Sequence, residues 1–220
     1  MPKIPAPPEV VSSIRENIIM EAAALINEVG YSDFSMRRLG SRLGVAAKTI
    51  YNYFTDKDEL YLLIVTKGFE ILFYRFQEAY SSADDPFARL RAMARAYIDY
   101  GIENPHLYSI MFSMGTPKYA DYVGTRHEKL AESQNLTALR SAELAERVLR
   151  EIANRGPGTG AEDANYRLMY VWSTLHGIVS LSLSRVTLEV GDFSRYIDRM
   201  IDDTLECYRT EGDRPSRTTP

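Results

Sequence analysis

Hydrophobic positions recur with helical spacing along most of the 220-residue chain. Ser13 and Glu16 have the spacing of a capping box, and the apolar residues around them follow one helical stripe: Ile14, Ile18, Ala22, Leu25 and Ile26. Gly30 is well placed to end this helix. The pattern therefore predicts an amphipathic helix from about Ser13 to Val29, preceded by a loose, proline-rich arm over residues 1–8.

The next apolar residues predict two short helices joined by a tight turn. Ser35 can accept a hydrogen bond from the backbone N–H of Arg38, so a helix should begin near Met36. Gly44 can take the left-handed conformation that reverses the chain. The expected shared inner face consists of Leu39, Leu43, Val45, Ile50 and Phe54. This face leaves a second set of residues mostly outward: Ala47, Lys48, Thr49, Tyr51, Asn52 and Tyr53.

Longer helices follow, and several carry recognisable start signals. One should run from Asp56, with Asp56 or Thr55 as its cap, to about Tyr80. Asp85-Pro86 and Asn104-Pro105 each open a further helix, and the segment 116–124 after the second of these is expected to be a loop. Three more helices are expected at about 126–154, 161–185 and 193–208, with a glycine-rich linker at 155–160 and a disordered tail at 211–220. No strand is predicted, so the fold class is all-α.

Composition favours a globular protein, because 45% of the residues are hydrophobic and can form a sizeable core. No apolar run is long enough to span a membrane, and no signal peptide is evident, so we expect a cytoplasmic protein without a membrane partner. The single cysteine, Cys207, is consistent with that location. The net charge is −4, but between Ser35 and Lys57 five basic residues accompany one acidic residue: Arg37, Arg38, Arg42, Lys48 and Lys57, with Asp56. Such a local basic face fits a nucleic-acid partner.

The segment from Phe34 to Leu60 resembles the helix-turn-helix of TetR-family transcriptional regulators. The family pattern has a glycine-turned second helix, a recognition helix ending in Tyr-x-(His/Tyr)-Phe, and then Lys-Glu-x-Leu. Here the corresponding residues are Gly44-Val45, Ile50 to Phe54, and Lys57 to Leu60. Ala46 stands where the family usually has a capping Ser, and Lys48 where a small residue is usual.

The resemblance implies a three-helix DNA-binding domain at residues 1–55 and a larger helical domain for effector binding and dimerisation at residues 56–210. It further implies a homodimer that binds a double-stranded DNA operator. Lys48, Thr49 and Asn52 are the candidates for reading bases in the major groove. The candidates for phosphate contacts are Ser35, Arg37, Tyr51, Tyr53 and Lys57.

A second motif, Trp172-x-x-x-His176-Gly177, looks like that of one subgroup of TetR ligand-binding domains. His176 can equally be a core or interface histidine that stacks on Trp172. Aromatic and methionine residues suit a cavity for a mostly apolar effector, although the same residues can form a solid core. The candidate effector-binding residues are Phe69, Phe73, Tyr97, Tyr108, Met111, Phe112, Trp172 and His176.

Catalytic and metal-binding patterns are weak in this sequence. His106, His127, His176 and Cys207 lack the spacing of a metal site, and no nucleophile elbow occurs. We therefore predict no enzyme activity, no catalytic residue, no metal and no cofactor. The favoured function is a repressor that a small molecule releases from DNA. The alternative is an all-α enzyme or scaffold that merely contains a helix pair.

Overall fold

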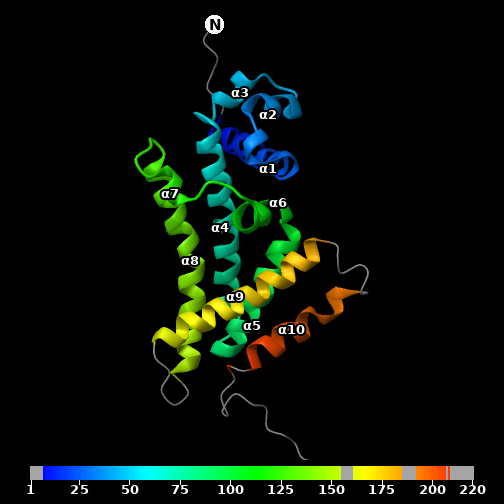
Figure 1. The fold of residues 1–220 in the computed structure, drawn as a ribbon, viewed down its shortest axis with the longest axis vertical. Coiled ribbons are helices and arrows are strands. Elements are labelled where there is room, and N and C mark those ends of the chain that lie inside the picture. The colour runs from blue at the N-terminus through cyan, green and yellow to red at the C-terminus, as the bar shows by residue number, and fades with distance from the viewer. Residues whose placement is uncertain (1–6, 155–160, 185–191, 207, 209–220) are drawn as a thin grey trace, which may run out of the picture. The chain divides into compact units, whose positions relative to one another are not determined.

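The computed structural model describes residues 7–154, 161–184, 192–206 and 208, and the regular structure in them is entirely helical (Figure 1). This confirms the all-α prediction.

The chain divides into two compact units, residues 1–69 with 106–137, and residues 70–105 with 138–220. None of the described helices is both long and apolar enough to cross a membrane. The predicted linker at 155–160, Cys207 and the tail at 211–220 lie outside the described residues.

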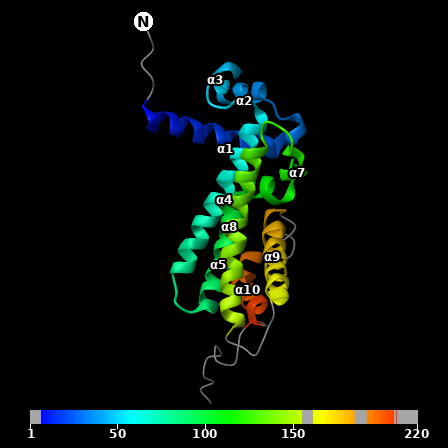
Figure 2. The same ribbon diagram turned by 90° about the vertical axis from the view of Figure 1, so that its left-hand side faces the viewer.

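The first unit begins with α1 (Pro8–Asp33), α2 (Met36–Leu43) and α3 (Ala47–Tyr51), which pack together as Figures 1 and 2 show. Helix α1 starts earlier than predicted, because Pro8 at its first position already has the φ angle of a helix. Ser13 therefore lies within the helix and forms no capping box. Gly30 interrupts α1 with a φ of 79°, as its predicted role at the helix end requires.

Two long helices, α4 (Lys57–Ser81) and α8 (Glu128–Ala153), follow their predicted limits closely. Helix α5 (Pro86–Glu103) begins at the predicted proline. The Asp85 side chain accepts a hydrogen bond from the backbone N–H of Ala88 at 2.8 Å, which confirms the predicted cap of α5. The boundary between the two units falls within α4 and within α8, so both helices belong partly to each unit.

The segment between α5 and α8 differs from the prediction in two places. The helix opened by Asn104-Pro105 has only one α-turn, α6 (Pro105–Tyr108), and continues as a π-helix (Ser109–Ser113). The wide turn closes with a hydrogen bond from the N–H of Met114 to the carbonyl of Ser109. A short helix, α7 (Tyr119–Tyr122), lies in the expected loop, because Asp121 accepts a hydrogen bond from the N–H of Lys118 at 2.7 Å.

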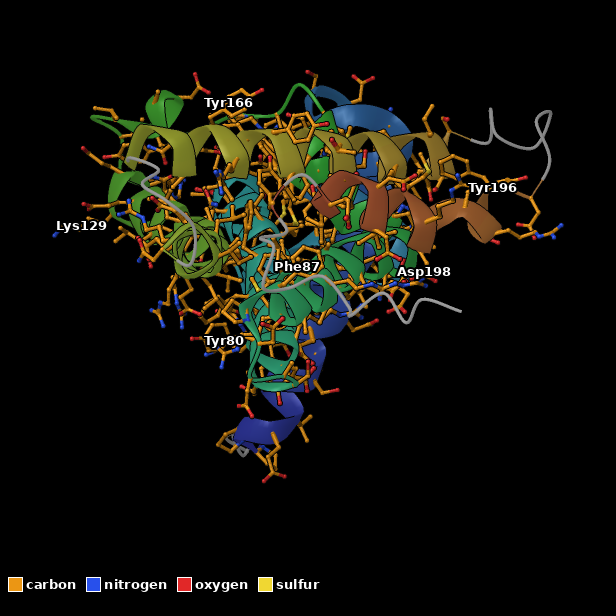
Figure 3. All side chains as sticks on the ribbon, turned by 90° about the horizontal axis from the view of Figure 1, so that it is seen from below. Tyr80, Phe87, Lys129, Tyr166, Tyr196 and Asp198 are labelled. Carbon is orange, nitrogen blue, oxygen red and sulfur yellow. The ribbon has the colours of Figure 1, made fainter. Side chains whose placement is uncertain are left out.

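The second unit packs α5 against α9 (Ala161–Leu183) and α10 (Ile197–Glu206). Its core includes Ile178, Val179 and Ile201, which are almost fully buried. The predicted helix over 193–208 begins as a separate 3-10 turn, Phe193–Tyr196, in which the Asp192 side chain accepts a hydrogen bond from the N–H of Ser194 at 3.2 Å. Figure 3 shows Tyr166 on the outer side of α9, whereas Phe87 of α5 is buried.

Candidate nucleic-acid interface

Local hydrogen bonds fix the start and end of α2. The Ser35 hydroxyl accepts from the backbone N–H of Arg38 at 3.2 Å, and Gly44 adopts a left-handed φ of 68° at the other end. Both features confirm the sequence prediction. Ala46 at the start of α3 supplies no side-chain cap, as the departure from the family pattern led us to expect.

Gly40 brings the two helices of this pair into close contact, a role that the sequence pattern had not revealed. A Cβ atom at this position would lie 2.8 Å from the carbonyl oxygen of Val45 and 3.1 Å from the backbone nitrogen of Ala47. The N–H of Val45 also donates to the carbonyl of Gly40 at 2.9 Å. The absence of a side chain at residue 40 therefore sets the distance between α2 and the start of α3.

The predicted inner face is largely confirmed. Leu39, Ile50 and Phe54 are buried, and Leu43 is half-buried. Val45 is an error in that prediction, because 39% of its surface is exposed. It lies in the tight turn after Gly44, where the backbone rather than the side chain faces α2.

The residues predicted to contact DNA lie on the opposite face of α3 and in the turn directly after it. Lys48, Thr49, Tyr51 and Asn52 are exposed, and Tyr53 is half-buried. Within the described part of the chain, no hydrogen bond or ion pair holds the side chain of Lys48. These residues, Lys48, Thr49, Tyr51, Asn52 and Tyr53, are called the recognition row below. The row is accessible to a ligand from solvent.

The basic residues around this row have different environments. Arg42 pairs with Glu21 at 2.8 Å and Glu28 at 2.7 Å, which raises the pKa of its guanidinium group through hydrogen bonding. Arg37 is exposed and has no ion pair with any described residue. Lys57 is half-buried, with its Nζ 4.3 Å from the centre of the Tyr31 ring. Among the described residues of this region, the positive charge that no carboxylate pairs therefore lies on Arg37, Arg38, Lys48 and Lys57.

The first turn of α4 joins this region to residues much later in the chain. Asp56 caps the helix by accepting from the N–H of Glu59 at 2.8 Å, and its other oxygen contacts Arg126 and, at 2.9 Å, His127. Asp56, Asp58 and His127 place three potential metal-ligand atoms within 4.8 Å of one another. Sequence spacing could not reveal this group. Because the oxygens already accept bonds from Arg126, Tyr31 and Tyr122, we assign the group a structural role.

The candidate effector residues fall into both units. In the first unit, the Phe69 and Phe112 rings meet edge to face at 5.6 Å, and Phe112 lies 5.0 Å from Tyr108. Tyr108 and Met111 are buried. The rings of Phe69, Phe112 and Tyr108 therefore form one aromatic cluster.

In the second unit, Tyr97 joins Trp172 and His176. The Trp172 indole N–H donates to the Tyr97 hydroxyl at 3.0 Å, and that hydroxyl lies 3.4 Å from Nδ1 of His176. Burial lowers the pKa of His176 and favours its neutral form. A neutral Nδ1 can accept the Tyr97 proton, so the three side chains can form a continuous hydrogen-bonded chain.

The eighth candidate, Phe73, lies elsewhere in the second unit. It packs under the Arg140 guanidinium at 4.0 Å and lines a groove of about 310 Å³ between α4 and α8. The other lining residues are Gln77, Tyr80, Ser81, Arg140, Glu143, Leu144 and Arg147.

One side of α9 is apolar yet exposed. Val171, Leu175 and Ile178 are buried against the rest of the second unit, whereas a second set of large apolar residues on the same helix is 40% to 66% exposed: Tyr166, Met169, Tyr170, Trp172 and Leu181. On α10 the apolar residues Ile197, Ile201 and Leu205 are instead buried within the chain. A surface of this kind is typical of a protein contact.

Comparison with known proteins matches both parts of the chain to one family. The family model described as "Bacterial regulatory proteins, tetR family" covers residues 18–64. The model described as "Tetracyclin repressor-like, C-terminal domain" covers residues 90–204.

Relatives and solved structures agree with this match. The transcriptional activator FasR of Mycolicibacterium smegmatis is 26% identical over 44% of this chain and 45% of its own length. The transcriptional repressor KstR2 of the same species is 21% identical over 57% of this chain and 63% of its own length, so less than two thirds of either relative is matched. The structure of the TetR-family regulator PfmR from Thermus thermophilus has a TM-score of 0.69 at 20% identity, covering 89% of this chain and 95% of that one. The chain therefore belongs to the TetR family of bacterial regulatory proteins.

Proposed function

We propose that the chain is a DNA-binding transcriptional regulator that acts as a homodimer on a near-palindromic operator. The observation that carries the proposal is the exposed row on α3, held at a fixed distance from α2 by Gly40 and Gly44. Membership of the TetR family supports it, and the matched relatives are named as transcriptional regulators, which supports the prediction that the chain is no enzyme. Residues 1–55 form the DNA-binding domain in this proposal.

Each exposed residue has a proposed role. Lys48 donates to guanine acceptors in the major groove, and Thr49 offers a hydroxyl and a methyl group. Asn52 reads a base at the end of the helix. Phosphate groups are held by five residues: Ser35, Arg37, Tyr51, Tyr53 and Lys57. Lys57 is at the first position of α4, where the helix dipole adds to its positive charge.

A gel shift with the DNA upstream of the chain's own gene tests this proposal. A retarded band supports sequence-specific binding if it persists when unrelated DNA is added as competitor at the same salt concentration. If neither that DNA nor a sequence selected from a random pool binds more tightly than nonspecific DNA, the proposal fails. The alternative, an all-α protein without DNA function, would then be favoured.

The homodimer is proposed to form through the exposed apolar side of α9. Two recognition helices must enter successive major grooves about 34 Å apart, which one chain cannot achieve. Tyr166, Met169 and Leu181 supply an apolar surface that a second copy can cover. On α10, Ile201 and Leu205 are buried inside the chain, so only the exposed residues of this helix can contribute to the dimer contact.

We also propose that a small, mostly apolar molecule releases the protein from DNA, making it a repressor of the subgroup with the Trp-x-x-x-His-Gly motif. The hydrogen-bonded cluster of Tyr97, Trp172 and His176 supports an effector contact in the second unit, because it combines aromatic surface with polar groups. A hundredfold loss of operator affinity needs only about 2.7 kcal/mol of coupling. Operator binding that is indifferent to a broad panel of hydrophobic compounds would refute this part.

A further inference from the structure

The first turn of α4 carries two carboxylates that connect helices far apart in the sequence. Asp58 accepts hydrogen bonds through one oxygen from the hydroxyl of Tyr31 on α1 and, at 3.2 Å, from that of Tyr122 on α7. All three residues belong to the first unit. One carboxylate oxygen thus joins the DNA-binding helices to α7.

The two tyrosines remain hydrogen-bond donors at physiological pH. Burial raises the pKa of Tyr31 and of Tyr122, and the neighbouring Asp58 carboxylate raises both further. Hydrogen bonds to an ionised acceptor are stronger than those between neutral groups. Negative charge in the first turn of α4 is also favoured by the helix dipole. The Asp58 junction is therefore well suited to hold its partners in place.

Tyr31 in turn holds Lys57. The Nζ atom of Lys57 donates to the backbone carbonyl of Tyr31 at 3.2 Å and lies 4.3 Å from the centre of the Tyr31 ring. The position of this ammonium group therefore depends on where the Tyr31 ring is held. The ring is held by its hydroxyl on Asp58 and by an edge-to-face contact with the Tyr61 ring at 4.8 Å. A cation over an aromatic face is attracted only within about 6 Å.

Two further contacts fix the α7 region to the same helix. The Tyr61 hydroxyl donates to the carbonyl of Pro117 at 3.0 Å, one turn after the Asp58 junction. Arg126 and His127, just before α8, contact the capping carboxylate of Asp56. The segment from Pro117 to His127 is consequently attached to α4 at three points, and Tyr122 is the middle one.

We propose that Tyr122 is a positioning residue for DNA binding: through Asp58 and Tyr31 it sets the place of the Lys57 ammonium group. The inference rests on the proposed function, in which Lys57 holds a phosphate. If Tyr122 acts in this way, α7 affects operator affinity although it lies outside the helix-turn-helix. A movement of the segment 117–127 would then change the position of Lys57.

The test compares two variants that remove one hydroxyl each from the same short helix. Tyr122→Phe loses its bond to Asp58. Tyr119→Phe is the matched control, because its hydroxyl has no hydrogen bond with any described residue. We expect Tyr122→Phe to raise the dissociation constant for the upstream DNA about fivefold, the scale of one net hydrogen bond, while Tyr119→Phe leaves it unchanged. Equal affinities of the two variants would overturn the proposal.

A double-mutant cycle separates positioning from a general structural effect. If Tyr122 acts through Lys57, the Tyr122→Phe change has no further effect on affinity in a Lys57→Ala background. Each single variant should also reduce the slope of log affinity against log salt concentration, by up to the amount that corresponds to one phosphate contact. A full fivefold effect of Tyr122→Phe in the Lys57→Ala background, or an unaltered salt slope, would contradict the route through Lys57.

Chemical labelling supplies a readout without DNA. Acetylation of Lys57 by acetic anhydride, followed by mass spectrometry with Lys129 as internal reference, should be faster in Tyr122→Phe than in wild type or Tyr119→Phe. Unchanged labelling would overturn the inference whatever the DNA result. A wild-type chain that binds no DNA, together with faster labelling in Tyr122→Phe, would instead refute the proposed function and leave the positioning of Lys57 standing.

Discussion

Substitution of Gly40 by alanine tests how the spacing of the helix pair is set. Helix propensity alone favours the change, because alanine is better than glycine inside a helix by about 1 kcal/mol. The structure gives the opposite expectation. The new Cβ would lie 2.8 Å from the carbonyl oxygen of Val45, which is backbone and cannot rotate away.

The expected change in the free energy of unfolding follows from these two opposed effects. Forcing a methyl group into a closely packed contact costs about 1 to 3 kcal/mol, so we expect Gly40→Ala to be destabilising by about 1 kcal/mol after the gain in propensity. Relief of the clash must move the start of α3 away from α2 and weaken the bond from the N–H of Val45 to residue 40. The recognition row would shift with it, so operator affinity should fall by at least about tenfold, because small misplacements weaken several contacts together.

Urea unfolding and a gel shift measure the two consequences. Gly44→Asn is the matched control, since asparagine tolerates a left-handed φ and a Cβ there meets nothing within 4 Å. We expect this control to keep wild-type DNA affinity and to lose no more than about 1 kcal/mol of stability, because an L residue is mildly strained at a φ of 68°. If Gly40→Ala were instead stabilised by about 1 kcal/mol with unchanged DNA affinity, the close contact would not determine the spacing.

Lys48→Ala should relax sequence preference and cost about 1 to 3 kcal/mol of binding, whereas Lys57→Ala should weaken all sequences alike; competition with operator variants at several salt concentrations distinguishes them. Leu181→Arg should give folded monomers in light scattering, because this side chain is 45% exposed, whereas Ile201→Arg should unfold the second unit, because that residue is fully buried. Burial lowers the pKa of His176, so its contribution to stability is complete above its unfolded pKa of about 6.5 and is lost as the pH falls toward the lower folded value. Urea unfolding between pH 5 and 8 should therefore show a weaker pH dependence for His176→Gln; an unchanged slope would contradict this.

The sequence by itself determined the local features of the fold. Ser35, Asp85 and Gly44 mark helix ends because their hydrogen bonds or φ angles involve residues only a few positions away. The helical period placed Lys48 and Thr49 opposite the buried Ile50 for the same reason. Capping and amphipathic spacing depend on neighbours in the chain, so one sequence was enough to predict them.

Only the tertiary structure decided which distant residues meet. Tyr31 and Tyr122 reach Asp58 across 27 and 64 positions, and no periodic pattern indicates such a junction. The candidate effector residues are also divided between the two compact units, with Phe69 in one and Trp172 in the other, which no sequence pattern indicated. Contacts of this kind depend on how whole helices pack, which is settled by the sum of many side-chain volumes rather than by any local spacing.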